Sequence, residues 1–175
     1  MKPIIKTYKG TTPKVAEDAF IAENAVLIGD VEIGEQSSIW YSCVLRGDVH
    51  EIRVGARSNI QDGSVVHVTA GKFGTYIGDD VLVGHNAVIH GCTLEDGAFV
   101  GMGATVLDGA VVESGAMVAA GALVAPGKRV KSGELWGGNP AKKMRDLTPE
   151  QIAGLKAGTD HYVDVASGYL NEENS

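Results

Sequence analysis

The stretch that decides the fold is Leu94–Val130, which reads LEDGAF VGMGAT VLDGAV VESGAM VAAGAL VAPGKR V when it is divided into groups of six. Each group begins with an aliphatic residue, and a glycine follows three positions later in all six groups. An alanine stands at the fifth position of the first five groups. A period of six is not the 3.6-residue period of an amphipathic helix, so the pattern predicts a repeat of short strands and turns.

The same six-residue step runs through most of residues 21–130. Aliphatic positions also recur from Ile21 to Leu45, from Val54 to Val66 and from Ile77 to Ile89, which makes eighteen hexads in all. In a solenoid of this kind, three hexads close one triangular coil, with the aliphatic and small residues inside and glycine at the turns. We therefore expect a mainly β protein, a parallel β-helix of about six coils.

The composition agrees with a narrow interior and excludes some partners. The chain has 175 residues, 24 of them glycine and only 6% aromatic. Its 15 Lys and Arg against 22 Asp and Glu argue against nucleic acid and anionic membranes, because phosphate binding needs clustered cations. No apolar run is long enough to span a membrane, and the N-terminus lacks the apolar core of a secretory signal. We expect a cytoplasmic protein whose two cysteines, Cys43 and Cys92, are structural.

A C-terminal helix is predicted from about Pro149 to about Leu170. Thr148 fits the N-cap, Pro149 the first helical position and Gln151 the capping box, and apolar residues then recur at roughly helical spacing. A loop over Trp136–Pro140 is expected before it. We expect a β-helix domain over residues 1–147, and a helix with a tail over 148–175 that packs on the solenoid.

The six-residue period breaks where functional insertions usually collect, at the steps Leu45–Val54, Val66–Ile77 and Ile89–Leu94. His67 and His90 each follow an aliphatic residue by one position and lie one coil apart, so we expect them to stack about 4.8 Å apart. Two stacked imidazoles can converge on one metal ion.

His85 belongs to a different face of the same coil, and a face of six residues is too long for it to reach round the corner to the pair. If copies pack around a threefold axis, a neighbour's His85 can face the pair instead. The same count puts Arg46 in the column of the pair, and it puts Asp62 one coil below His85 with Gln61 beside it.

These residues resemble the γ-class carbonic anhydrase family of hexapeptide-repeat proteins, which are trimeric, left-handed parallel β-helices with zinc between subunits. The matching segments, within about 15–143, are Leu45–Asp48, Asn59–Gly63, Val66–His67 and Gly84–Cys92. The resemblance implies the left hand of the helix and a homotrimer with shared metal sites. In each site, His67 and His90 of one subunit and His85 of the next would bind Zn²⁺, or Fe²⁺ or Co²⁺ in its place.

The resemblance also implies roles for four further residues. Gln61 would orient bound water or a small-molecule substrate, Arg46 and Asp48 would form an ion pair across the subunit interface, and Tyr162 would approach the substrate. Three neutral imidazoles leave a fourth position for water, whose pKa zinc lowers to about 7, so metal-bound hydroxide would hydrate carbon dioxide.

The residues themselves also allow purely structural roles. The histidines can be corner residues that only form hydrogen bonds, Arg46 with Asp48 a structural interface pair, Gln61 part of a stacked polar ladder, and Tyr162 a packing residue.

One departure concerns proton export. The characterised active branch of the family has acidic proton shuttles after its Arg-x-Asp motif and in a projecting loop. Here Val49 follows Asp48, and the loop over residues 68–76 contains no carboxylate. The expected carbonate dehydratase-type lyase would thus have weak or lost activity. Two alternatives remain: a hexapeptide-type acyltransferase or thioesterase acting on acyl-CoA, and a non-catalytic scaffold for an unidentified protein partner.

Overall fold

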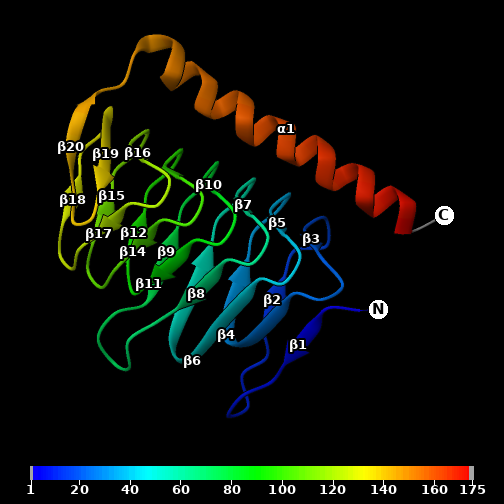
Figure 1. Cartoon of the computed structure of the whole chain (residues 1–175). Coiled ribbons are helices and arrows are strands. Elements are labelled where there is room, and N and C mark those ends of the chain that lie inside the picture. Colours follow the sequence, from blue (N-terminus) through cyan, green and yellow to red (C-terminus); the bar gives the residue numbers. More distant parts are fainter. Residues whose placement is uncertain (1, 174–175) are drawn as a thin grey trace.

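The computed structural model describes residues 2–173, which form a parallel β-solenoid followed by one long helix (Figure 1). The aliphatic residue of each hexad points into the solenoid, and Val100, Val106 and Val112 are fully buried. Gly97 and Gly103 occupy corners with φ of 68° and 65°, a left-handed conformation that costs glycine little because it has no Cβ. The predicted mainly β solenoid with a C-terminal helix is confirmed.

The strands are short because each spans one flat side of a coil. Their bounds are β1 (Ile4–Lys6), β2 (Lys14–Val15), β3 (Phe20–Ile21), β4 (Val26–Ile33), β5 (Ser38–Ile39), β6 (Val44–Val54), β7 (Asn59–Ile60), β8 (Val65–His67), β9 (Thr75–Ile77), β10 (Leu82–Val83), β11 (Val88–His90), β12 (Thr93–Leu94), β13 (Phe99–Val100), β14 (Thr105–Val106), β15 (Val111–Val112), β16 (Met117–Val118), β17 (Leu123–Val124), β18 (Arg129–Val130), β19 (Glu134–Gly138) and β20 (Ala141–Asp146).

Strands of successive coils pair in parallel and form three faces. One face follows the order β6-β8-β11-β14-β17 and a second follows β6-β9-β12-β15-β18, so the long strand β6 contributes to both. The third face follows β3-β5-β7-β10-β13-β16-β19 and ends on β20. Because the pairing keeps its register from coil to coil, residues at the same phase form columns along the solenoid axis.

The third face has seven parallel strands, so the solenoid has about seven coils where six were expected. The seventh begins at Trp136, which pairs with Val118 and continues the six-residue step with an aromatic residue. The loop expected over Trp136–Pro140 is wrong in its first half, because β19 runs through Gly138 and pairs antiparallel with β20. This hairpin satisfies backbone groups that the last coil would otherwise leave unpaired.

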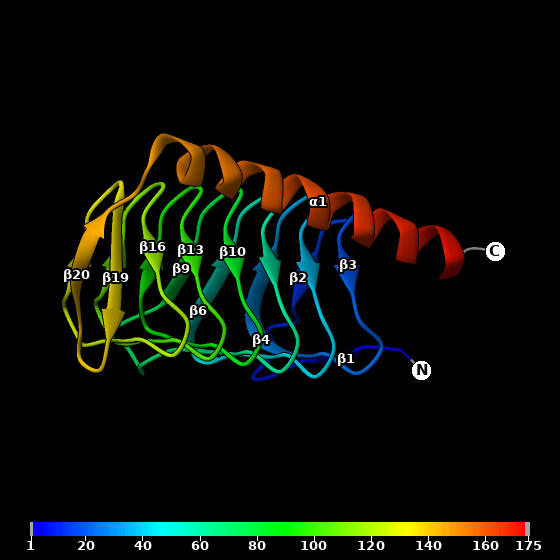
Figure 2. The same cartoon turned by 45° about the horizontal axis from the view of Figure 1, so that its top comes forward.

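Helix α1 (Pro149–Glu173) runs back over the third face from the last coils to the first (Figures 1 and 2). It begins with the predicted capping box: the Gln151 amide donates to Thr148 Oγ1 (3.3 Å), and Gln151 Oε1 accepts the Thr148 amide (3.1 Å). It continues three residues beyond the expected end, and residues 174 and 175 of the expected tail lie outside the described residues. Between residues 2 and 173, no helix has the length and apolar character needed to cross a membrane.

Both cysteines lie in the core as free thiols, as expected. Cys43 and Cys92 are 0% and 2% exposed, and burial raises the pKa of each thiol to about 12. Their role is therefore structural.

Candidate metal centre

Two histidines are brought side by side on the first face by strand register. His67 ends β8 and His90 ends β11, and the two residues are direct partners in the parallel pairing of these strands. The loop inserted after β8 and the shortened step after β11 begin at these corners. The Nδ1 atom of His67 and the Nε2 atom of His90 lie 3.1 Å apart.

The outer nitrogen of each ring faces a carboxylate. His67 Nε2 lies 3.2 Å from Asp48 Oδ1, and His90 Nδ1 lies 2.6 Å from Asp108 Oδ1. An ionised carboxylate only accepts hydrogen bonds, so each neutral imidazole carries its N–H on the outer nitrogen. The two inner nitrogens then both present lone pairs, which cannot hydrogen-bond to each other. This arrangement favours a cation between the rings.

The donor set fits a metal such as zinc. Two nitrogens bound tetrahedrally at about 2.0–2.1 Å lie about 3.3 Å apart, close to the 3.1 Å between the inner nitrogens. Burial lowers the pKa of His67, and the Arg46 guanidinium acts in the same direction, so the neutral form with its free lone pair is favoured. Histidine ligands commonly donate their other N–H to a carboxylate, as both rings do here.

One chain supplies only part of such a site. Among the residues that the structure describes, no three His, Cys, Asp or Glu side chains form a group that could hold a metal ion. His85 lies on the turn after β10, on the third face, and its side chain is 40% exposed. Its Nδ1 is 2.8 Å from Asp62 Oδ2, the residue that the coil count places one coil below it.

Gln61 and Tyr162 lie with His85 around a pocket of about 630 Å³ beneath the first turns of α1. The pocket is otherwise mostly apolar. Gln61 is only 5% exposed; its Nε2 donates to Asn59 Oδ1 (3.2 Å), and its side chain also hydrogen-bonds to the Tyr162 hydroxyl. Burial and the nearby Asp62 carboxylate raise the pKa of Tyr162, so the phenol stays protonated. His85, Gln61 and Tyr162 are thus on a different face from the histidine pair.

Arg46 and Asp48 form an ion pair within one chain. Arg46 Nη1 lies 2.7 Å from Asp48 Oδ2, whereas the resemblance places this pair across a subunit boundary. The two residues are separated by one position on the extended strand β6, so their side chains point to the same side. Burial works against ionisation of Asp48, but hydrogen bonds from Arg46 and His67 lower its pKa below the ordinary value.

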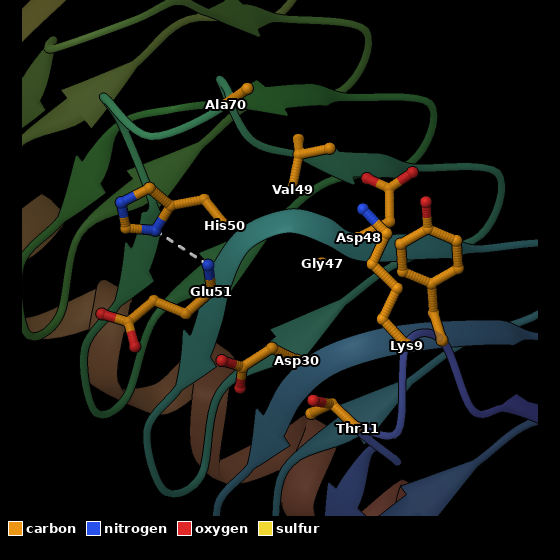
Figure 3. A pocket seen from close by; sticks show the side chains of 10 residues that line it. Lys9, Thr11, Asp30, Gly47, Asp48, Val49, His50, Glu51 and Ala70 are labelled. Atoms are coloured by element: carbon orange, nitrogen blue, oxygen red, sulfur yellow. Dashed lines mark hydrogen bonds between the residues drawn. The ribbon is translucent and has the colours of Figure 1, made fainter.

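Asp48 also borders an open pocket of about 680 Å³ between the 47–51 segment and the turn that the antiparallel bridge of Tyr8 and Thr11 closes. Figure 3 shows His50 and Asp48 on opposite sides of Val49. The His50 Nδ1 atom accepts a hydrogen bond from the Glu51 amide (2.8 Å). The Glu51 carboxylate accepts hydrogen bonds from Arg53 (2.8 Å) and from the Tyr76 hydroxyl, two residues that do not line this pocket. Glu51 is therefore engaged away from the histidine pair.

Sequence reasoning missed Asp108, Thr69 and Asn59. Asp108 could have been found by counting, because it falls one coil after Gly91, the residue that follows His90. Thr69 donates to Asp108 Oδ2 (2.7 Å), a contact across the inserted loop that no local pattern signals. Asn59 Nδ2 is buried without a hydrogen-bond partner among the described residues, which only the structure reveals.

Comparisons with known proteins place this chain among hexapeptide-repeat proteins. The family model described as bacterial transferase hexapeptide (six repeats) matches residues 74–108. A crystal structure of a hexapeptide transferase family protein from Anaplasma phagocytophilum superposes with a TM-score of 0.92 at 51% identity, covering 95% of this chain and 98% of that one.

Two curated relatives narrow the assignment. Gamma carbonic anhydrase 2, mitochondrial, of Arabidopsis thaliana is 56% identical over 93% of this chain, and the match covers 60% of the plant protein. A probable carbonic anhydrase of Methanocaldococcus jannaschii is 53% identical over 87% of this chain and 95% of its own length. The chain belongs to the γ-class carbonic anhydrase-like family of hexapeptide-repeat proteins.

Proposed function

We propose that this chain is a metal-dependent, γ-carbonic anhydrase-like enzyme that hydrates carbon dioxide at sites shared between the subunits of a homotrimer. In each site, His67 and His90 of one subunit and His85 of the next bind the metal, which is Zn²⁺ or in its place Fe²⁺ or Co²⁺. The observation that carries the proposal is the pair of inner imidazole nitrogens, which lie 3.1 Å apart. The outer nitrogen of each ring faces a carboxylate, which orients the ring so that its inner nitrogen points at the other histidine.

An apolar strip beside the histidine pair supports a shared site. Ile4, Val65 and Val88 are 54%, 39% and 37% exposed. They belong to one column of the first face, which the pairing register extends through Val26 and Val44. Val65 and Val88 precede the two histidines by two positions and so point to the same side. In the proposed trimer, the copy that covers this strip would present its own third face, with His85, to the pair.

Zinc held by three imidazoles lowers the pKa of a bound water to about 7, which supplies the nucleophile for hydration. The residues of the chain prepare the site for it. Asp48 keeps the N–H of His67 on the outer nitrogen, and Arg46 holds Asp48 in place. Gln61, anchored by Asn59 and Tyr162, would orient water or carbon dioxide from the third face of the subunit that contributes His85.

Mixed trimers test the shared site. His67→Ala and His85→Ala chains are purified separately and then co-assembled, and the metal that survives a chelator wash is measured. Neither variant alone can form a full ligand set, whereas each mixed trimer forms one complete site at one of its interfaces. Regained metal in the mixture is the expected result. Mixtures that stay empty would show that each site lies within one chain and would overturn the shared arrangement.

Carbon dioxide hydration by the metal-loaded protein tests the activity. The loop over 68–76 has no carboxylate that could carry the proton away. We therefore expect low turnover in a buffer that does not take up this proton, and a clear increase when imidazole is added as a proton carrier. Full metal occupancy with no hydration in either buffer would contradict the proposed reaction.

The pocket beside His85 favours acyl transfer or thioester hydrolysis as the second candidate. Its walls include Leu82, Phe99 and Met117, which suit an acyl chain. Turnover of acyl-CoA that is lost in His85→Ala, without carbon dioxide hydration, would favour this reaction. An assembled, metal-free protein with neither activity would favour a binding scaffold.

A further inference from the structure

Asp108 holds two partners at once, one on each carboxylate oxygen. Its Oδ1 faces His90 Nδ1 at 2.6 Å, and its Oδ2 accepts the Thr69 hydroxyl at 2.7 Å. Thr69 begins the inserted loop and pairs with Phe73 in an antiparallel bridge that closes it. A single carboxylate therefore connects one histidine of the candidate site to the base of a loop that follows the other histidine.

The loop and Asp108 also rest on the same two glycine corners. A Cβ built on Gly91 would lie 2.6 Å from Asp108 Oδ1 and 3.0 Å from Phe73 Cβ. A Cβ on Gly109 would lie 3.2 Å from the Phe73 ring. Asp108, Phe73 and the two corners are thus in close contact, so a change in one is transmitted to the others.

The charge of Asp108 fixes the direction of both hydrogen bonds. Each of its carboxylate oxygens lies within hydrogen-bond distance of a group that can donate, the His90 ring nitrogen on one side and the Thr69 hydroxyl on the other. As an ionised acceptor it requires a donor on each side. His90 must then carry its N–H on Nδ1, which leaves the Nε2 lone pair directed at His67.

We propose that Asp108 and Thr69 are positioning residues that couple metal binding to the order of the Thr69–Phe73 loop. Asp108 fixes the ring and tautomer of His90, and Thr69 holds the second oxygen of Asp108 in place. The inference rests on the proposed function, because it concerns the metal bound there. Coupling between two events is reciprocal, so the metal orders the loop as much as the loop strengthens the metal site.

Metal affinity of the assembled protein provides the first test, with Co²⁺ alone as the probe in competition with a chelator. We expect Asp108→Asn to bind about 10- to 100-fold more weakly, the usual effect of losing such an outer partner. Thr69→Val should weaken binding by a smaller factor, although Thr69 does not touch the metal, and Thr69→Ser should restore it. The visible absorption of bound Co²⁺ should change in Asp108→Asn.

Two matched controls separate this role from general stability. Asp96 precedes a glycine at the same hexad position as Asp108 but at another corner of the solenoid. Its carboxylate accepts the Asp79 amide (2.9 Å) and has no contact with a histidine among the described residues. Thr93 lies on β12, where it pairs with Tyr76 at the end of the inserted loop, outside the Thr69–Phe73 bridge. Asp96→Asn and Thr93→Val should bind Co²⁺ as the parent does. Should Asp108→Asn fail to fold, Thr69→Val, which loses one hydroxyl, carries the test.

Trypsin cleavage at the exposed Lys72 reports the loop without any activity assay. Co²⁺ should protect this bond in the parent chain, and the protection should be lost in Thr69→Val. If the parent binds Co²⁺ but the Asp108 and Thr69 variants bind it equally well, or if metal leaves Lys72 cleavage unchanged, this inference is overturned while the proposed function stands. A parent that binds no metal overturns both.

Discussion

Replacing Trp40 with alanine should detach helix α1 from the solenoid. Trp40 is 6% exposed, and its ring centroid lies 5.1 Å from that of Phe20, 5.4 Å from Tyr169 and 5.8 Å from Tyr162. Two of these partners are on α1, so the indole links the helix to the first coils. Truncating a buried aromatic residue to alanine costs about 3–5 kcal/mol, because it removes packing contacts and leaves a cavity.

Hydrogen exchange measures this loss locally and is suited to an assembled protein. About 1.4 kcal/mol of opening free energy changes the exchange rate tenfold, so even half of the expected loss should be visible in the amides of residues 159–170. Amides of β14 should keep their protection, because β14 lies on the first face, whereas α1 packs on strands of the third. Trp40→Phe is the matched control: it keeps a ring and loses the Nε1 bond to Ser38 (3.0 Å), at a cost of about 1–2 kcal/mol.

The reasoning would be refuted if Trp40→Ala left exchange in α1 within about twofold of the parent value while urea unfolding showed a loss below about 1 kcal/mol. A uniform loss of protection over all coils would also refute it, because the helix would then be no more dependent on Trp40 than the solenoid is.

Three further outcomes are expected. Cys43 and Cys92, whose pKa is raised to about 12 by burial, should not react with a thiol reagent at pH 8 until the protein is unfolded; rapid labelling of the native protein would contradict their burial. Gly91→Ala should lower stability by more than about 1 kcal/mol, measured by urea unfolding, because φ is 55° and the new Cβ would press on Asp108 Oδ1; an unchanged midpoint would count against this packing. Ala116→Leu should destabilise by about 1–3 kcal/mol through overpacking, since Ala116 is fully buried, and a thermal midpoint equal to the parent's would indicate spare volume inside the coil.

The solenoid could be predicted because its signal is local and repeated. Each hexad places one aliphatic residue inside regardless of what lies far away, and the count of coils alone put His67 opposite His90. Counting failed at Trp136, where an aromatic residue opens the seventh coil and the backbone then turns antiparallel.

The outer partners of the site were harder to foresee. Asp108 precedes a glycine in its hexad as Asp96 does, and it looks like an ordinary turn residue. Its distinction is the contact with His90, which depends on the shortened step after Ile89 and on how the inserted loop folds back. Such contacts join different coils through side chains, and no periodic pattern encodes them.

The return of α1 over the first coils has a consequence for folding during synthesis. Coils can stack in the order in which the ribosome releases them, since each pairs only with its neighbours. Phe20 and Trp40 are made early but are covered by Tyr162 and Tyr169, which emerge much later. A growing chain therefore carries an uncovered aromatic patch for most of its synthesis. When α1 covers that patch, the last segment of the chain becomes packed against its first coils.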